Sequence, residues 1–121
     1  MNKYHAIKYK GFDSKLEAKR YEMLKAMEAR GEISHLETQV PFELIPNQYE
    51  PETVDEKGKR KKGKLIERKC TYIADFMYLD KDGRLVVEDA KGLERPEYII
   101  KRKLMLYFFN IRVQQYTRTT R

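Results

Sequence analysis

The sequence predicts one α/β domain whose elements follow in the order α-β-β-β-α-β. Its 121 residues are a usual size for a single domain, and a hydrophobic content of 40% can form a core. Two segments show helical periodicity next to helix-start residues, and the segments between and after them alternate as strands do. No internal repeat interrupts this succession.

The first predicted helix spans residues 15–30. Ser14 and Glu17 fit a capping box at its start, and Gly31 follows where a left-handed residue often ends a helix. The second predicted helix begins at Pro96, which suits a first helical turn, and runs to about Asn110.

Strand patterns occupy most of the remaining chain. Residues 36–44 alternate, with the apolar side chains from Leu36 to Leu44 on one face, and Pro41 indicates an edge position or a bulge. A long strand over residues 65–79, a turn closed by Gly83 and a second strand to residue 91 form a predicted hairpin. The last predicted strand covers residues 111–117, and residues 1–13 are interpreted as a short arm or strand.

The chain is basic, with 26 Lys and Arg against 19 Asp and Glu and a net charge of +7. Such a balance favours a polyanionic partner, because Lys and Arg displace counterions from phosphates, but it does not separate DNA from RNA or an anionic membrane. Much of the charge lies in residues 57–64, within a segment at about 46–64 that is predicted to be a mobile basic loop or hairpin tip. A run of this kind is often only a solvated loop, and contact with DNA is the alternative.

Cys70 is the only cysteine, which excludes an intrachain disulfide and a cysteine-based zinc site and fits a reducing compartment. No apolar run approaches the roughly 18 residues that a membrane span needs. The N-terminus lacks the apolar stretch of a secretion signal. We therefore expect a soluble, cytoplasmic protein with no membrane partner.

Charges on apolar faces identify site candidates, because burying an unpaired ion costs several kcal/mol. In the first helix Glu17 falls on the apolar arc between Leu24 and Tyr21, although a capping role beside Ser14 explains it equally well. In the last helix Lys101 falls within the apolar arc. A lysine whose stem covers the core while its ammonium reaches water is the common alternative there.

The predicted hairpin gives the clearest signal. Two aliphatic side chains lead to an acid and a base on one face of its second strand: Leu85, Val87, Asp89 and Lys91. On the first strand, Asp75 is expected to share a face with Ile73 and Met77. If Asp75 and Asp89 face the same way, their carboxylates supply the oxygen ligands that Mg²⁺ prefers, with Lys91 beside them. A buried Asp–Lys salt bridge is the structural alternative, and such pairs often cost more in desolvation than they return.

Glu88 neighbours Asp89 but is expected to point to the other face of the strand, with Val86 and Ala90. We interpret it as a salt-bridge residue or a supporting residue of the site. A local bulge would exchange the roles of Glu88 and Asp89.

Asp75, followed fourteen positions later by Asp89-Ala90-Lys91, resembles the PD-(D/E)XK signature of the restriction-endonuclease-like nucleases, with Ala74 in place of the proline. The segments 14–18, 72–76 and 87–92 together resemble a family of small phage and prophage proteins in that superfamily, over residues 12–113. The resemblance implies a restriction-endonuclease-like core with a mixed central sheet flanked by helices. It also implies a Mg²⁺ site in which Mn²⁺ is expected to substitute.

The resemblance further implies that Asp75 and Asp89 are the main metal ligands, that Glu17 joins them and that Lys91 is the catalytic lysine. It assigns Tyr98 and Lys101 to supporting the site or contacting phosphate. Basic residues of the loop and of the last helix are expected to position DNA by its phosphates: Lys59, Arg60, Lys61, Lys62, Lys64, Arg102 and Lys103.

These expectations describe a Mg²⁺-dependent DNA endonuclease, encoded by a phage or prophage and acting in the cytoplasm of the bacterial host. Among nucleases we expect a Holliday-junction resolvase of DNA recombination that acts as a homodimer on branched or four-way DNA, and this choice rests on the resemblance. The alternative enzyme is a general or nicking endonuclease. Two alternatives are not enzymes: a nucleic-acid-binding module that stacks bases on its nine tyrosines, and a phage structural or assembly protein.

Overall fold

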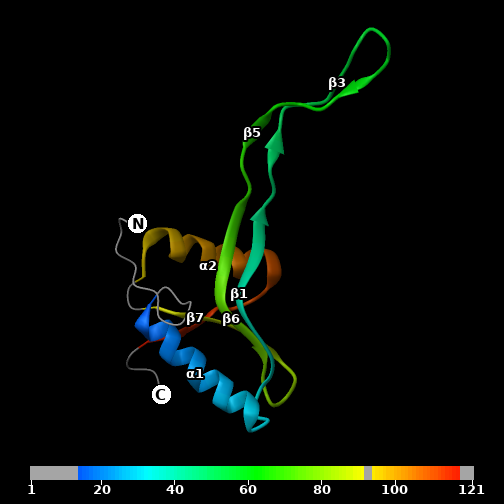
Figure 1. Cartoon of the computed structure of the whole chain (residues 1–121). Coiled ribbons are helices and arrows are strands. Elements are labelled where there is room, and N and C mark those ends of the chain that lie inside the picture. The colour runs from blue at the N-terminus through cyan, green and yellow to red at the C-terminus, as the bar shows by residue number, and fades with distance from the viewer. Residues whose placement is uncertain (1–13, 92–93, 118–121) are drawn as a thin grey trace.

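The computed structural model of the chain describes residues 14–91 and 94–117 (Figure 1). Its main elements are α1 (Lys15–Ala29), β1 (Ser34–Ile45), β6 (Cys70–Leu79), β7 (Leu85–Ala90), α2 (Pro96–Phe109) and β8 (Gln114–Tyr116). Four short strands lie between β1 and β6: β2 (Gln48–Tyr49), β3 (Thr53–Val54), β4 (Arg60–Lys61) and β5 (Leu65–Glu67). The predicted order of the main elements is confirmed, and the prediction for residues 1–13 lies outside the described residues.

The main sheet has the strand order β1-β6-β7-β8. β6 pairs antiparallel with both β1 and β7, whereas β7 and β8 are parallel, so the sheet is mixed. β1 lies at an edge, as Pro41 predicted. The protein is therefore an α/β fold with a mixed central sheet and two helices.

The two helices cover opposite faces of this sheet. Successive residues of a strand point to opposite faces, and on β7 Val86 packs beside α1 whereas Val87 packs beside α2. The core is accordingly divided into two clusters. The α1 cluster is centred on Leu24 and Phe76, and the α2 cluster on Met105 and Tyr98.

Local signals in the sequence set the ends of the helices and the main turn. The Ser14 hydroxyl accepts a hydrogen bond from the backbone N–H of Glu17 at 3.0 Å, and Gly31 follows α1 with φ +77°. α2 begins at Pro96 and ends at Asn110, which has φ 55°. Gly83 closes the β6–β7 turn with φ +79°, as predicted.

Both β1 and β6 change the face that they bury near their midpoints. On β1, Leu36 packs against the α1 cluster but Phe42 against the α2 cluster, and the left-handed Gln39 (φ 52°) lies between them. The prediction of one apolar face for this strand is therefore wrong, because a left-handed residue breaks the alternation.

On β6 the buried residues divide in the same way: Ala74 belongs to the α2 cluster and Phe76 to the α1 cluster. Met77 packs against the α2 cluster, whereas Ile73 is 54% exposed. The predicted common face of Ile73, Asp75 and Met77 is thus wrong. The change occurs at Asp75, which lies opposite Gln39 in the register between Thr38↔Phe76 and Val40↔Ala74.

Residues 46–69 form a long hairpin that projects from the sheet, and we call this segment the arm (Figure 1). β2 pairs with β5 near its base and β3 pairs with β4 near its tip. At the tip the Asp55 carboxylate accepts the backbone N–H groups of Lys57 and Lys59, and Gly58 has φ +78°. The basic segment, predicted as a mobile loop or hairpin tip, contains short paired strands. The predicted strand over residues 65–79 is divided between β5 and β6.

Among the helices of the described ranges, none is both long and apolar enough to cross a membrane.

Candidate active site

The site lies where β6 and β7 separate. Their ladder runs from Leu79↔Leu85 to Phe76↔Glu88. Beyond it, the backbone N–H of Asp75 donates to Asp89 Oδ1 at 3.2 Å, and the backbone N–H of Ala90 donates to Asp75 Oδ2 at 2.9 Å. Each carboxylate therefore accepts a hydrogen bond from the backbone of the opposite strand. These two hydrogen bonds hold Asp75 and Asp89 close together, as the sequence predicted.

Asp89 is the most deeply buried acid of the site, with an exposed fraction of 1%. The Tyr72 hydroxyl donates to its Oδ2 at 2.5 Å, and the Lys91 ammonium lies 3.8 Å from the same oxygen. Burial, and next the charge of Asp89, raise the pKa of Tyr72 above its usual value, so the hydroxyl remains a donor. Asp89 is thus held by two neutral donors, the Tyr72 hydroxyl and the Asp75 backbone N–H, and by one cation.

Lys91 lies between an acid and an aromatic ring. Its Nζ is 4.7 Å from the centroid of the Tyr98 ring, at cation–π distance. Its backbone N–H donates to the carbonyl of Tyr116 at 2.9 Å, which ties it to β8. Tyr98 is 5% exposed and its hydroxyl accepts from Gln115 Nε2 at 3.0 Å. The predicted supporting residue Tyr98 therefore lies directly against the predicted catalytic lysine.

Among the acids of the site, Asp75 lies in the environment that most disfavours its negative charge. Burial raises its pKa to about 8, and the charges of Asp89 and then Glu17 act in the same direction. The hydrogen bond from Ala90 N–H opposes this effect but does not overcome it. A carboxyl group in this setting favours either a proton or a nearby cation.

Glu17 fills both of the roles that the sequence left open. Its backbone N–H makes the capping bond to Ser14, while its carboxylate is buried and accepts from Gln39 Nε2 at 2.7 Å. The left-handed backbone of Gln39 places this amide opposite Asp75 in the register. Glu17, Asp75 and Asp89 thus converge from α1, β6 and β7.

Glu88 points away from this centre, as predicted. It is 3% exposed, lies toward α1 and accepts from Arg20 at 2.5 and 3.0 Å and from the Tyr78 hydroxyl at 2.7 Å. Burial of an ion pair requires such complete pairing. The bulge that would have exchanged Glu88 and Asp89 does not occur, because Asp89 faces the site.

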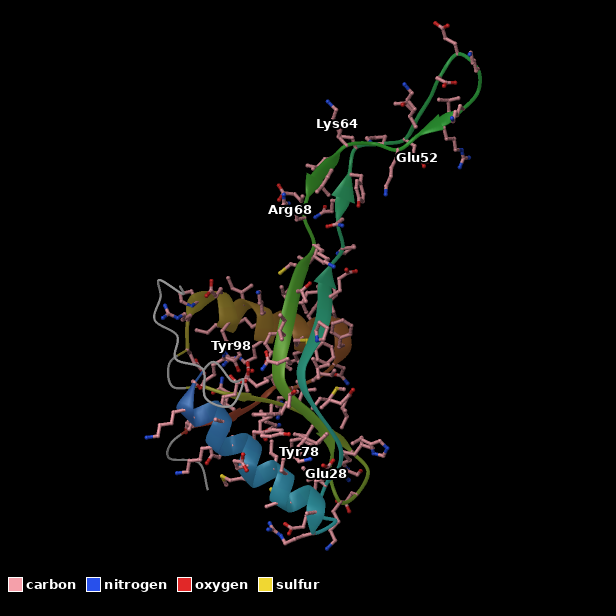
Figure 2. All side chains as sticks on the ribbon, viewed as in Figure 1. Glu28, Glu52, Lys64, Arg68, Tyr78 and Tyr98 are labelled. Atoms are coloured by element: carbon pink, nitrogen blue, oxygen red, sulfur yellow. The ribbon has the colours of Figure 1, made fainter. Side chains whose placement is uncertain are left out.

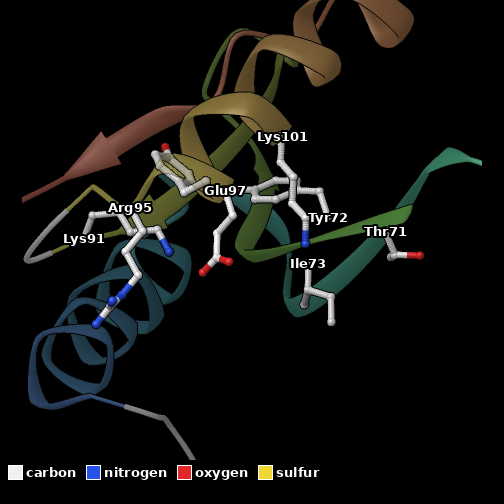
Figure 3. A pocket seen from close by; sticks show the side chains of 8 residues that line it. Thr71, Tyr72, Ile73, Lys91, Arg95, Glu97 and Lys101 are labelled. Atoms are coloured by element: carbon white, nitrogen blue, oxygen red, sulfur yellow. The ribbon is translucent and has the colours of Figure 1, made fainter. Parts of the chain in front are cut away.

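A pocket of about 300 Å³ opens beside Lys91, between β6 and the start of α2 (Figure 3). Thr71, Tyr72 and Ile73 form its β6 side, and Figure 3 shows Glu97 and Lys101 of α2 facing them. Its lining includes three cations and one acid: Lys91, Arg95, Lys101 and Glu97. The pocket can accept an anionic group beside Lys91, and it is lined by Lys101, which was predicted to support the site or contact phosphate.

The other predicted DNA contacts do not line the pocket, although the Arg102 guanidinium lies 5.9 Å from the centroid of the Tyr98 ring. Arg102 pairs with Glu94 at 3.2 Å and Lys103 is exposed on α2. The basic residues of the arm are exposed and belong to a separate part of the surface: Lys59, Arg60, Lys61, Lys62 and Lys64. The structure therefore brings together Glu17, Asp75, Asp89, Lys91, Tyr98 and Lys101, but not the arm.

Sequence reasoning missed three contributors to the site: Gln39, Tyr72 and Arg95. Tyr72 carried a usable signal, because it lies on the predicted strand three residues before Asp75 in an otherwise apolar run. Gln39 carried none, since its contact with Glu17 depends on a left-handed backbone.

The donor set fits a hard divalent cation. Mg²⁺ in proteins usually takes one or two carboxylates and completes its octahedron with water or substrate oxygens, and Asp75 and Asp89 are two such carboxylates side by side. Within residues 14–91 and 94–117, no three His, Cys, Asp or Glu side chains form a ready-made metal-holding group. Several of the carboxylate oxygens instead accept protein hydrogen bonds.

A model of the family described as "Protein of unknown function (DUF1064)" matches residues 1–121. No curated protein and no solved structure matches the chain.

Proposed function

Because the chain belongs to the DUF1064 family, whose description assigns no function, we propose its function from the site itself: a Mg²⁺-dependent DNA endonuclease that hydrolyses phosphodiester bonds. One observation carries the proposal. Glu17 of α1 and Asp89 of β7 lie near Asp75 of β6, whose pKa is raised to about 8 by burial and then by the charges of Asp89 and Glu17, and Asp89 and an aromatic ring hold a lysine beside them. A purely structural cluster would gain nothing from such repulsion.

Asp75 and Asp89 would hold the cation, and Glu17 would join them. When bound, the cation supplies Lewis acidity toward a phosphate oxygen and lowers the pKa of coordinated water. Tyr72 keeps the Asp89 carboxylate in one orientation through its 2.5 Å hydrogen bond. Lys91, held 3.8 Å from Asp89, presents its ammonium where it can orient the attacking water or stabilise negative charge on the phosphorane.

The fold supports a restriction-endonuclease-like core. The mixed sheet, the order α-β-β-β-α-β and the position of Asp75 and Asp89-Ala90-Lys91 on two adjacent strands agree with the resemblance. The cationic pocket beside Lys91 supports a phosphate-bearing substrate. For the substrate we propose branched DNA, with the four-way junction as the leading candidate for a homodimer and a general or nicking activity as the alternative.

The test is cleavage of a four-way junction, a linear duplex and single strands by the purified protein with Mg²⁺, Mn²⁺ or EDTA. We expect metal-dependent cleavage that Asp75→Asn abolishes while DNA binding persists or tightens, because repulsion between the carboxylate and phosphate is relieved. The exposed acid Glu37 on β1 provides the control, Glu37→Gln, which should cleave normally. Cleavage of the junction alone supports the resolvase. Cleavage of every substrate identifies a general nuclease.

Failure to cleave any substrate with either metal, with metal-independent DNA binding unchanged by Asp75→Asn, would contradict the proposal and favour the binding module.

A further inference from the structure

The arm has no hydrophobic core of its own. Every residue from 46 to 69 is exposed except Asp55 and Gly63, which are half-buried. A lone two-stranded ribbon is at best marginally stable in water, and burial within the protein does not explain this one. The exposed apolar residues of the arm are spread along it, with Tyr49 at its base and Val54 near its tip.

Charge divides the arm lengthwise. The outgoing strand, residues 46–56, carries acids and no base: Glu50, Glu52, Asp55 and Glu56. The returning strand, residues 57–69, carries eight bases and only Glu67 as an acid: Lys57, Lys59, Arg60, Lys61, Lys62, Lys64, Arg68 and Lys69. Among the described residues, two of these bases have a side-chain contact: Arg60 lies 3.9 Å from Glu52, and Lys62 lies over the Tyr49 ring.

This division favours a polyanion over a second copy of the arm. Two arms related by a twofold axis would pair like edge with like edge, which places acid against acid or base against base. A phosphate backbone instead fits the returning strand while the outgoing strand faces away. A two-stranded ribbon also has the width that the major groove of B-DNA admits.

The arm is bent, and Gly63 permits the bend. The backbone N–H of Glu50 donates to the carbonyl of Lys64 at 2.8 Å, and a Cβ at Gly63 would lie 1.9 Å from the Glu50 carbonyl oxygen. Only glycine tolerates this approach of the two strands. Figure 1 shows the ribbon changing direction between β5 and β4, and Figure 2 shows the labelled Lys64 and Glu52 on either side of that change.

The returning strand leads from the arm into the site. Arg68 and Lys69 precede β6, and Thr71 already lines the pocket beside Lys91. Lys64 lies eleven residues before Asp75, which is at most about 36 Å along an extended chain at roughly 3.3 Å per residue. One helical turn of B-DNA is about 34–36 Å, or 10–10.5 base pairs. The distal lysines therefore reach DNA that lies about one turn from the carboxylates.

We propose that the arm is a duplex-holding element: its returning strand binds the phosphates of double-stranded DNA about one helical turn from the cleavage centre. This inference rests on the proposed function for the position of the cut, and it names the substrate as DNA with a duplex flank on one side. The protein then binds a short duplex through the core alone and a longer one through core and arm together.

The test is binding of a duplex of about 7 base pairs, closed by a hairpin loop and shorter than one helical turn, and of a blunt duplex of 30 base pairs, measured by fluorescence anisotropy in EDTA over 50–200 mM salt. The arm variant combines Lys59→Gln, Lys61→Gln, Lys62→Gln and Lys64→Gln. The control removes as many charges from exposed residues of α1 and the β6–β7 turn: Lys19→Gln, Lys25→Gln, Lys81→Gln and Arg84→Gln.

We call the ratio of the short-duplex Kd to the long-duplex Kd the long-duplex advantage. We expect this ratio to fall at least fivefold in the arm variant and to stay unchanged in the control. For the long duplex, the slope of log K against log salt concentration should decrease by up to about 3.6, since each of the four lost phosphate contacts removes about 0.9. The short duplex should be bound almost equally, because the Debye length of about 10 Å is less than the separation. Equal loss on both lengths, or no loss on either, would overturn the proposal.

Gly63→Ala tests the shape of the arm with its charge unchanged. It should reduce the long-duplex advantage without changing binding of the short duplex, and a normal advantage in this variant would show that the bend is unnecessary. A change in the oligomeric state of the arm variant, measured by light scattering, with unchanged DNA binding would assign the arm to protein contacts and overturn the proposal.

None of these measurements requires cleavage. If the wild-type protein shows arm-dependent binding but cuts no DNA with Mg²⁺ or Mn²⁺, the proposed function fails and the inference about the arm stands. If it cuts DNA but the long-duplex advantage does not depend on the arm, the reverse holds.

Discussion

Asp75→Asn should stabilise the metal-free protein at high pH. The wild-type carboxyl group has its pKa raised to about 8 by burial and by the charges of Asp89 and Glu17. An asparagine oxygen can still accept the hydrogen bond from Ala90 N–H, and its amide removes the repulsion. The substitution therefore changes the charge while it keeps the shape and the interstrand contact.

The magnitude follows from the difference between the folded and unfolded pKa of Asp75. The folded state binds this proton more tightly than the unfolded chain, whose value is 3.8, so wild-type stability falls as the pH rises from about 4 through about 8. Each pH unit corresponds to about 1.36 kcal/mol, which gives at most about 4 kcal/mol between pH 5 and pH 8. Because water reaches part of the group, the expected effect is smaller than this limit. Between pH 5 and pH 8, the free energy of unfolding of Asp75→Asn should rise by roughly 1–3 kcal/mol relative to that of the wild type.

The assay is urea unfolding of both proteins at pH 5 and pH 8, first in EDTA and then with Mg²⁺. The other titratable groups are present in both proteins, so their contributions to the pH dependence of stability cancel in the comparison. Mg²⁺ should stabilise the wild type according to its concentration and affinity, whereas Asp75→Asn should respond little. The control Glu37→Gln should change the pH dependence by less than about 0.5 kcal/mol.

Two results would refute the reasoning. The first is an Asp75→Asn protein whose stability relative to the wild type does not rise between pH 5 and pH 8. The second is equal stabilisation of both proteins by Mg²⁺, which would place the cation elsewhere.

Three further predictions concern other parts of the molecule. Lys91→Met should reduce single-turnover cleavage by about 10²–10³-fold with DNA affinity nearly unchanged, since it removes charge stabilisation rather than binding; a purely weaker affinity would contradict its role. Arg20→Met should cost about 3–5 kcal/mol in urea unfolding because it leaves Glu88 buried and unpaired, and Glu88→Gln in the same protein should recover part of the loss. Replacing residues 51–63 by Asn-Gly should shift the melting temperature by less than about 4 °C, because the arm buries almost no side chain, and a larger loss would show that the arm supports the core.

The order of elements was predictable because local signals control it. Ser14, Gly31, Gly83 and Pro96 act through their own backbone or side-chain chemistry, and each marks the boundary that it predicted. The opposite orientations of Glu88 and Asp89 were predictable for a similar reason, since β7 alternates without interruption.

The faces of β1 and β6 were not predictable from periodicity. Gln39 adopts φ 52° without a glycine or an Asn-Gly signal, and the resulting change of face moves Phe42 to the opposite cluster from Leu36. The contact of Gln39 with Glu17 joins residues 22 positions apart and follows from this geometry. The ribbon form of the arm was also only partly predicted, because its hydrogen bonds join polar segments that lack a hydrophobic period.

The exchange of backbone bonds between Asp75 and Asp89 gives the protein two natural probes. The amide protons of Asp75 and Ala90 have carboxylates, not carbonyls, as their acceptors. A ligand that binds these carboxylate oxygens in place of the two amides breaks both hydrogen bonds. Hydrogen exchange of the two amides should then accelerate, while the amides of Phe76 and Tyr78 within the sheet stay protected. Occupancy of the centre can therefore be followed by hydrogen–deuterium exchange, with NMR or mass spectrometry, without a substrate or a substitution.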